Sequence, residues 1–222
     1  MNPQILYEDN HILAVNKMPG TLVQGDKTGD ACIPDLMKAF IKERDSKPGN
    51  VFLGLPHRLD RPTSGVLVLA KTSKALSRLT ESFRNRDTRK IYWAIVESPP
   101  KNPEGELVHW LRKDVRTNTA QLTNPGTPGA KEARLRYRQI ASARGFSLIE
   151  VELITGRHHQ IRAQLSFIGC PVLGDRKYGA EKTDFNGNIY LHARSLEFPH
   201  PTRPERLSVT APPPEDSLWD AF

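Results

Sequence analysis

Short apolar runs of strand length dominate this sequence and limit the folds open to it. Such runs occupy residues 12–15, 66–70, 91–96 and 146–154, and residues 133–139 alternate between arginines and other side chains. Only about residues 33–44, the segment after Thr72 or Ser73, and residues 158–167 have helical spacing. Because strands outnumber helices and the two do not alternate regularly, we expect an α+β fold with a mixed, mainly antiparallel sheet core and flanking helices.

No Pro/Gly-rich linker or fixed-period repeat divides the 222 residues, so we expect one domain over residues 1–222. Its acidic C-terminal tail, residues 211–222, has three prolines near its start and is expected to be extended. No apolar run approaches the roughly 20 residues that span a bilayer, and the first residues do not resemble a secretion signal. We therefore expect a cytoplasmic protein without a membrane partner. Cys32 and Cys170 fit no zinc or disulfide spacing and are expected to be buried.

The chain is basic, with a formal net charge of +7 and a pI of about 9.5. Such a charge favours a polyanionic partner such as nucleic acid. Charge alone fits a basic enzyme without such a partner equally well.

The segment His57–Gly65, HRLDRPTSG, places an acidic residue in a turn before a buried strand. In an extended backbone Arg58 and Asp60 share one face while Leu59 turns to the other. The proline and glycine that follow favour a turn, so Asp60 is expected on an exposed loop with rigid support, where catalytic groups often lie. Taken alone, the segment also fits a turn-forming aspartate beside a solvated arginine.

This segment resembles the signature of the RluA-type pseudouridine synthase family, which is HRLD, two variable residues and TSG. Other segments resemble further family motifs in the family's order, from Tyr7 to about Thr210: Val15–Lys17 with Pro19–Gly20, Lys90–Tyr92, Thr155–Arg162, Pro171–Asp175 with Tyr178–Gly179, Leu191–Ala193 and Leu196–Pro201. The chain departs from the pattern at Met18, which precedes the motif proline, at Gln164, where the family usually has histidine, and at His158, where a small residue is common. Seven motifs in order make chance a poor explanation.

The resemblance implies an enzyme that isomerises uridine to pseudouridine in RNA, with Asp60 as the catalytic carboxylate acting on a flipped-out base. Tyr92 resembles the family tyrosine that stacks on the target base, and Arg162 the arginine that pairs with the catalytic aspartate. Arg58 resembles the residue that fills the gap left by the base. The alternatives are that Tyr92 is an ordinary aromatic residue of a strand and that both arginines are simply solvated at the surface.

The resemblance also implies a structured RNA partner, ribosomal or transfer RNA, with a monomer as a plausible state. The family's motifs begin at Tyr7, so no S4 module is expected and the target would be a local hairpin or loop. Backbone phosphates are expected to meet a basic cluster beside Tyr92, formed by Arg84, Arg86, Arg89 and Lys90. The arginine face of residues 133–139 is a second candidate, or simply a solvated strand face.

No cofactor or metal is expected, because the isomerisation involves neither redox chemistry nor hydrolysis. His158 and His159 fall in the expected helix, where neighbours point about 100° apart and cannot chelate one ion together. The resemblance implies a structural hydrogen bond for His159, and Asp175 with Tyr178 is expected to form a supporting turn without chemistry.

Two other classes of function remain open. A catalytically silent RNA binder could use the same fold, although it would not need Asp60, Tyr92 and Arg162 together. A metal-dependent nuclease would suit the basic charge, but the sequence lacks a credible carboxylate and histidine cluster.

Overall fold

The computed structural model describes residues 3–25, 29–182 and 187–222. Contacts divide the chain into two compact units, the first made of residues 1–89 and 193–214, and the second of residues 90–192 and 215–222. Two of the three passages between the units fall inside strands, β4 (Arg89–Val96) and β9 (Leu191–Pro199), and the third falls in the tail between Pro214 and Glu215. The sequence therefore contains no linker within these strands, and the expectation of one domain stays a prediction.

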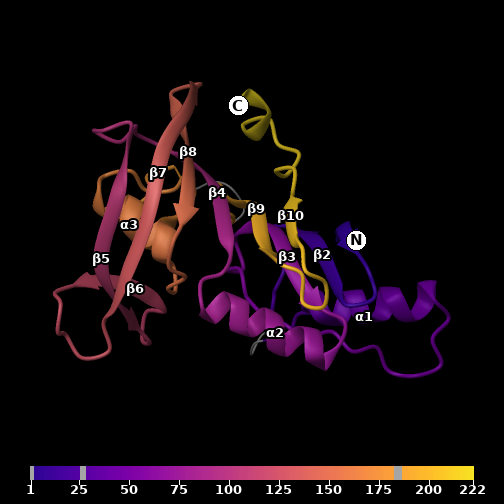
Figure 1. Cartoon of the computed structure of the whole chain (residues 1–222). Helices are drawn as coiled ribbons and strands as arrows, with labels where there is room; N and C mark the ends of the chain where they lie inside the picture. Colours follow the sequence, from indigo (N-terminus) through magenta and orange to yellow (C-terminus); the bar gives the residue numbers. More distant parts are fainter. Residues whose placement is uncertain (1–2, 26–28, 183–186) are drawn as a thin grey trace. The chain divides into compact units, whose positions relative to one another are not determined.

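The first unit is built on antiparallel pairing, both of strands that follow one another in the sequence and of strands that are distant in it (Figure 1). β1 (Gln4–Glu8) pairs with β2 (Ile12–Lys17), and β2 pairs with β3 (Ser64–Ala70). Next to β3 comes β9, which also pairs with β10 (Arg206–Thr210). The β2–β3 register sets Lys17 opposite Gly65, so the start of β3 and the loop before it lie beside the end of β2.

Two helices belong to the first unit, and both begin for local reasons. α1 (Ile33–Arg44) has a proline in its first turn and buries Ile33, Met37 and Ile41. α2 (Ser73–Arg84) is capped by Thr72, whose hydroxyl accepts a hydrogen bond from the Ala75 amide at 3.1 Å. α2 buries Ala75 and Leu79 in a cluster with residues of β2, β3, β9 and β10.

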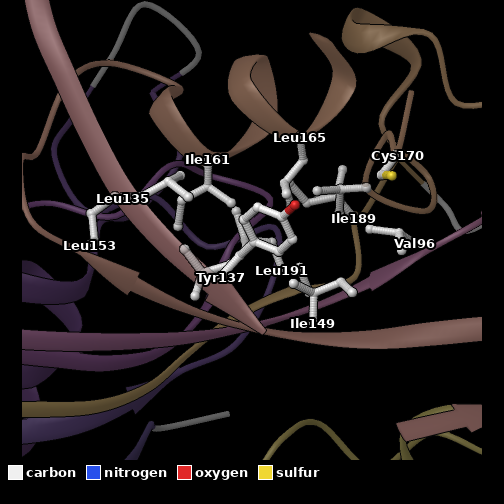
Figure 2. Close-up of a cluster of buried hydrophobic side chains, with 13 residues drawn as sticks. Val96, Leu135, Tyr137, Ile149, Leu153, Ile161, Leu165, Cys170, Ile189 and Leu191 are labelled. Atoms are coloured by element: carbon white, nitrogen blue, oxygen red, sulfur yellow. The ribbon is translucent and has the colours of Figure 1, made fainter. Parts of the chain in front are cut away.

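The second unit contains an antiparallel sheet with the strand order β4-β8-β7-β5-β6. The other strands are β5 (Glu104–Asp114), β6 (Thr119–Thr123), β7 (Lys131–Ala143) and β8 (Phe146–Leu153). Figure 2 shows Ile161 and Leu165 of α3 (Gln160–Phe167) pointing into a cluster with Leu135, Tyr137 and Ile149 of the sheet. Packing against this cluster fixes α3, and with it the polar residues at its start.

The α+β class with a mainly antiparallel sheet is confirmed, and both cysteines are buried and free. The tail was wrongly expected to be extended throughout. Residues 212–214 have no regular structure, but the tail then forms a short 3₁₀ turn, η2 (Trp219–Ala221), and buries Leu218 and Trp219. No described helix is long and apolar enough to cross a membrane.

Candidate functional site

Asp60 lies in a tight turn of the first unit, where its carbonyl accepts a hydrogen bond from the Thr63 amide at 3.1 Å. Leu59 is buried and Arg58 is exposed, as the alternation predicted, and Asp60 is half-buried. The guanidinium of Arg58 donates to Gln24 Oε1 at 3.1 Å. The turn thus holds Asp60 at the surface beside an accessible arginine.

A buried lysine at the end of β2 holds this turn in place through hydrogen bonds to its backbone. Lys17 has 0% of its surface exposed, and its Nζ donates to the carbonyls of Met18, Arg61 and Thr63 at 3.0, 2.9 and 2.7 Å. Burial lowers the pKa of Lys17 to about 7, while the negative charge of Asp60 acts in the opposite direction. Because two of the three carbonyls follow Asp60 closely in the chain, Lys17 fixes the backbone that carries the carboxylate.

Gly65 ends the turn in a conformation that only glycine supplies. Its φ is +111°, and a Cβ at this position would collide with the backbone of Ala193 in β9. The glycine therefore lets β3 approach β9 closely and fixes where the Asp60 turn joins the sheet.

His57 secures the other side of the turn. Its Nε2 accepts a hydrogen bond from the Val68 amide at 3.0 Å, which places the ring proton on Nδ1 in the neutral form. The ring stacks on Phe83 of α2 with centroids 4.5 Å apart and an angle of 11°. The motif histidine thus couples the turn to β3 and α2.

In the second unit, Arg162 of α3 forms a buried two-bond ion pair with Asp175. Its Nε and Nη2 lie 2.6 and 2.8 Å from the two carboxylate oxygens, and both side chains are at most 5% exposed. This geometry excludes surface solvation for Arg162. Asp60 belongs to the other unit, so the pairing of Arg162 with Asp60 stays a prediction.

His159 precedes α3 and has a left-handed backbone with φ of +50°. Its Nδ1 lies 2.9 Å from Tyr178 Oη, which also accepts a hydrogen bond from the Ala120 amide at 2.7 Å. Burial, followed by the positive charge of Arg162, lowers the pKa of His159 to about 2. The ring is therefore neutral near pH 7. The Arg162 guanidinium lies 5.1 Å from the Tyr178 ring centroid.

The expectation that His158 and His159 belong to a helix is wrong, because α3 begins at Gln160. The two rings do not diverge but stack, with centroids 3.8 Å apart. The helical argument against a shared metal ion therefore does not apply, and the absence of a metal stays a prediction.

Tyr92 lies on β4 opposite Val151 of β8 and is half-buried. It packs against the cluster that contains Ile161 and Leu165 of α3. Tyr92 and Arg162 are thus attached to the same packed core of the second unit.

The basic residues differ in whether carboxylates compensate them. On β7, Arg134 and Arg136 meet Glu106, and Arg138 meets Glu150, at 3.1 to 3.5 Å. Among the residues that the structure describes, five lysines of the second unit meet no carboxylate in an ion pair: Lys101, Lys113, Lys131, Lys177 and Lys182. Two of these, Lys113 and Lys177, contribute to the lowered pKa of His159 and so lie near it. The β7 arginines therefore form a compensated strand face.

The other predicted basic residues flank the end of α2. Arg84 lies in its last turn, 4.0 Å from Glu81, and Arg86 follows with φ of +62°. Arg89 and Lys90 are the first two residues of β4. Their role in RNA binding stays a prediction.

The sequence did not reveal that two residues near the site, Lys17 and Asp175, form buried polar contacts. Lys17 and Asp175 both lie in recognised motifs, but Lys17 was given no role, and Asp175 was given only that of a supporting turn with Tyr178. The available signals were a lysine that ends an otherwise apolar strand and an aspartate after a glycine turn. Neither signal distinguishes a buried charge from a solvated one.

Comparisons with known proteins agree with this arrangement. Residues 11–167 match the profile of the family described as RNA pseudouridylate synthase. The chain is 35% identical over 220 residues to an uncharacterized RNA pseudouridine synthase, YlyB, of Bacillus subtilis, covering 97% of this chain and 71% of that protein. It is 33% identical over 214 residues to the ribosomal large subunit pseudouridine synthase C of Vibrio parahaemolyticus, covering 94% of this chain and 65% of that longer protein.

Solved structures show the same fold. Human RNA pseudouridylate synthase domain containing 4 superposes with a TM-score of 0.81 at 28% identity, covering 97% of this chain and 90% of that one. Human RNA pseudouridylate synthase domain containing 1 gives a TM-score of 0.79 at 25% identity, with 99% and 87% covered. The chain therefore belongs to the RNA pseudouridylate synthase family, whose members are isomerases.

Proposed function

We propose that this protein isomerises uridine to pseudouridine at specific sites of structured RNA, with ribosomal RNA as the first candidate and transfer RNA as the second. The name of the Vibrio relative supports ribosomal RNA. The reaction breaks the N1–C1′ bond and forms a C5–C1′ bond. The C5 proton leaves and N1 gains a proton, so atoms balance without an oxidant or a hydrolytic water.

Asp60 is the proposed catalytic carboxylate, either as a nucleophile or as a stabiliser of charge at the detached base and sugar. One observation carries this proposal: buried Lys17 clamps the turn of Asp60 through three carbonyls. A solvated turn aspartate needs no such support, whereas a reacting carboxylate must be held in place, since an error of about 1 Å can cost about 100-fold in rate.

Arg162 is proposed to pair with Asp60 while Asp175 holds its Nε and Nη2 in place. The positive charge would keep Asp60 ionised. Tyr92 is proposed to stack on the extruded base, as its half-buried position on a packed strand allows. Arg58 is proposed to fill the vacated gap, because its exposed guanidinium is planar and its bond to Gln24 is exchangeable.

RNA phosphates are proposed to meet two sets of cations. The first is the predicted set at the start of β4 and the end of α2: Arg84, Arg86, Arg89 and Lys90. The second consists of Lys113, Lys131 and Lys177, which no described carboxylate compensates. The β7 arginines are left out, because each already meets a glutamate.

Tritium release from RNA labelled at C5 of uridine tests the proposal. An isomerase releases the label without shortening the RNA. A silent RNA binder releases nothing, and a nuclease shortens the RNA. Mapping of pseudouridine in total RNA with and without the protein would then identify the target. RNA of unchanged length, no tritium released into the water and tight binding of every RNA would together favour the silent binder.

A further inference from the structure

The residue after Asp60 is bonded to a second segment of the first unit in two directions. The Gly20 amide donates to the Arg61 carbonyl at 2.9 Å, and Arg61 Nε donates back to the Gly20 carbonyl at 2.9 Å. The same Arg61 carbonyl also accepts from Lys17 Nζ. Both the main chain and the side chain of Arg61 are therefore hydrogen-bonded to Gly20, which lies in the turn that follows β2.

The guanidinium of Arg61 continues to a carboxylate further along this segment. Its Nη2 lies 2.7 Å from Asp30 Oδ2. The segment is closed at its base by a bridge between Leu22 and Cys32 and by a hydrogen bond from the Ile33 amide to the Leu22 carbonyl at 2.8 Å. Asp30 is thus attached to the start of α1 and offers Arg61 a supported partner.

An exposed ion pair contributes little to stability, and the Arg61 and Asp30 side chains are 45% and 52% exposed. The geometry points to another use. Arg61 offers Nε to a carbonyl and Nη2 to a carboxylate at the same time, which the single ammonium of lysine cannot reproduce. A fork of this kind fixes the orientation of a backbone more than it stabilises a fold.

We propose that Arg61 and Asp30 form a brace that positions Asp60 for the isomerisation. This inference rests on the proposed function. Arg61 is a positioning residue: it acts through the backbone of the turn and not on the RNA. Without the brace the turn keeps its lysine clamp but gains freedom on its outer side, so turnover falls while RNA affinity is kept.

The alternative occupant of the Arg61 guanidinium is an RNA phosphate. The two roles predict opposite results for the variant Asp30→Asn, which leaves both Arg61 and Asp60 intact. A brace predicts a kcat lowered about 5- to 20-fold with unchanged Kd for RNA. A phosphate contact predicts tighter RNA binding, because the competing carboxylate charge is gone, with kcat unchanged.

The chain offers a closely matched control. Arg206 and Asp87 form an ion pair with the same 2.7 Å distance and with exposures of 45% and 53%, also within the first unit. The variant Asp87→Asn removes a pair of the same kind away from the Asp60 turn. It is expected to leave kcat unchanged.

The test compares four variants: Asp30→Asn, Arg61→Lys, their double variant and the control. For each variant we would measure single-turnover tritium release, RNA binding and hydrogen exchange of the peptide over residues 57–66. The brace predicts faster exchange of this peptide in both single variants. It also predicts a double variant no slower than Arg61→Lys, because the two residues act as one unit. Additive losses, unchanged exchange, or a loss of affinity in Arg61→Lys with kcat intact would overturn it.

The exchange measurement keeps this inference separate from the proposed function. If the wild-type protein releases no tritium, the function fails, and the brace is still judged by exchange. If the wild type is active but the variants match the Asp87→Asn control, the brace fails and the function stands. A melting temperature for each variant excludes global unfolding as the cause.

Discussion

Arg162 and Asp175 form a buried ion pair in which Nε and Nη2 of the arginine face the two carboxylate oxygens at 2.6 and 2.8 Å. The pair joins α3 to the turn before the short 3₁₀ helix Arg176–Tyr178. Its two bonds fix the plane of the guanidinium and therefore the direction of Nη1. If Arg162 also pairs with Asp60, as proposed, its orientation is set by Asp175.

Removal of Asp175 is expected to destabilise the protein strongly. In Asp175→Ala the arginine stays buried without this carboxylate, and breaking such a pair costs about 3–5 kcal/mol. Urea unfolding measures the loss, and the additional change Arg162→Met is expected to recover part of it. A cost below about 1 kcal/mol for Asp175→Ala would contradict this role.

Replacement of Lys17 by methionine is expected to lower kcat at least about tenfold while changing stability less than Asp175→Ala. Two effects on stability oppose each other: three carbonyls lose their donor, and the desolvation of a buried charge is removed. The loss of turnover has no such compensation, because the turn of Asp60 is released. Tritium release and thermal melting separate the two quantities. Full turnover in a folded Lys17→Met variant would refute the clamp.

The salt dependence of RNA binding is expected to distinguish the two basic surfaces. Lys113→Gln with Lys177→Gln should reduce the slope of log K against log salt by about 1.5, since each lost phosphate contact removes about 0.7–0.9. Arg136→Gln with Arg138→Gln removes the same charge from the compensated β7 face and should leave the slope nearly unchanged. Equal slopes for the two double variants would mean that carboxylate pairing does not decide which cations meet RNA.

His159 is expected to make stability depend on pH in the acidic range. Its pKa is about 2 in the folded protein and 6.5 in the unfolded chain, so below pH 6.5 the unfolded chain binds a proton that the folded protein does not. The free energy of unfolding therefore falls as pH decreases from about 6.5, by at most about 1.4 kcal/mol per pH unit from this group. His159→Asn tolerates the left-handed backbone and should show a shallower decrease in urea unfolding between pH 6.5 and 5. Identical decreases in both proteins would exclude His159 as the cause.

Local signals in the sequence predicted much of the fold. The spacing of Met37 and Ile41 located α1, and the hydroxyls of Thr72 and Ser73 placed the start of α2 to within one residue, because both signals depend on neighbours within one or two turns. Contacts between distant residues explain the errors. The left-handed His159 is stabilised by Tyr178, and Trp219 of the tail packs near Tyr190, with ring centroids 5.7 Å apart. Neither partner can be identified from spacing.

The candidate site was predicted to a similar extent. The motifs pointed to Asp60, Tyr92 and Arg162, whereas the supports of the site stayed hidden. A lysine in a strand usually indicates a solvated position, yet Lys17 is fully buried because three backbone carbonyls converge on it. Asp175 was expected to serve a turn, and its bond to Arg162 depends on how α3 packs. Sequence motifs thus indicate reacting groups more readily than the residues that hold them.

The central claim is that the carboxylate of Asp60 carries out the isomerisation. The direct measurement compares wild type and Asp60→Asn in single-turnover tritium release from C5-labelled RNA, with RNA affinity measured in parallel. The amide keeps the size of the side chain but removes the charge and the nucleophile. We expect no release above background by the variant at nearly unchanged affinity, and release at the wild-type rate would contradict the account.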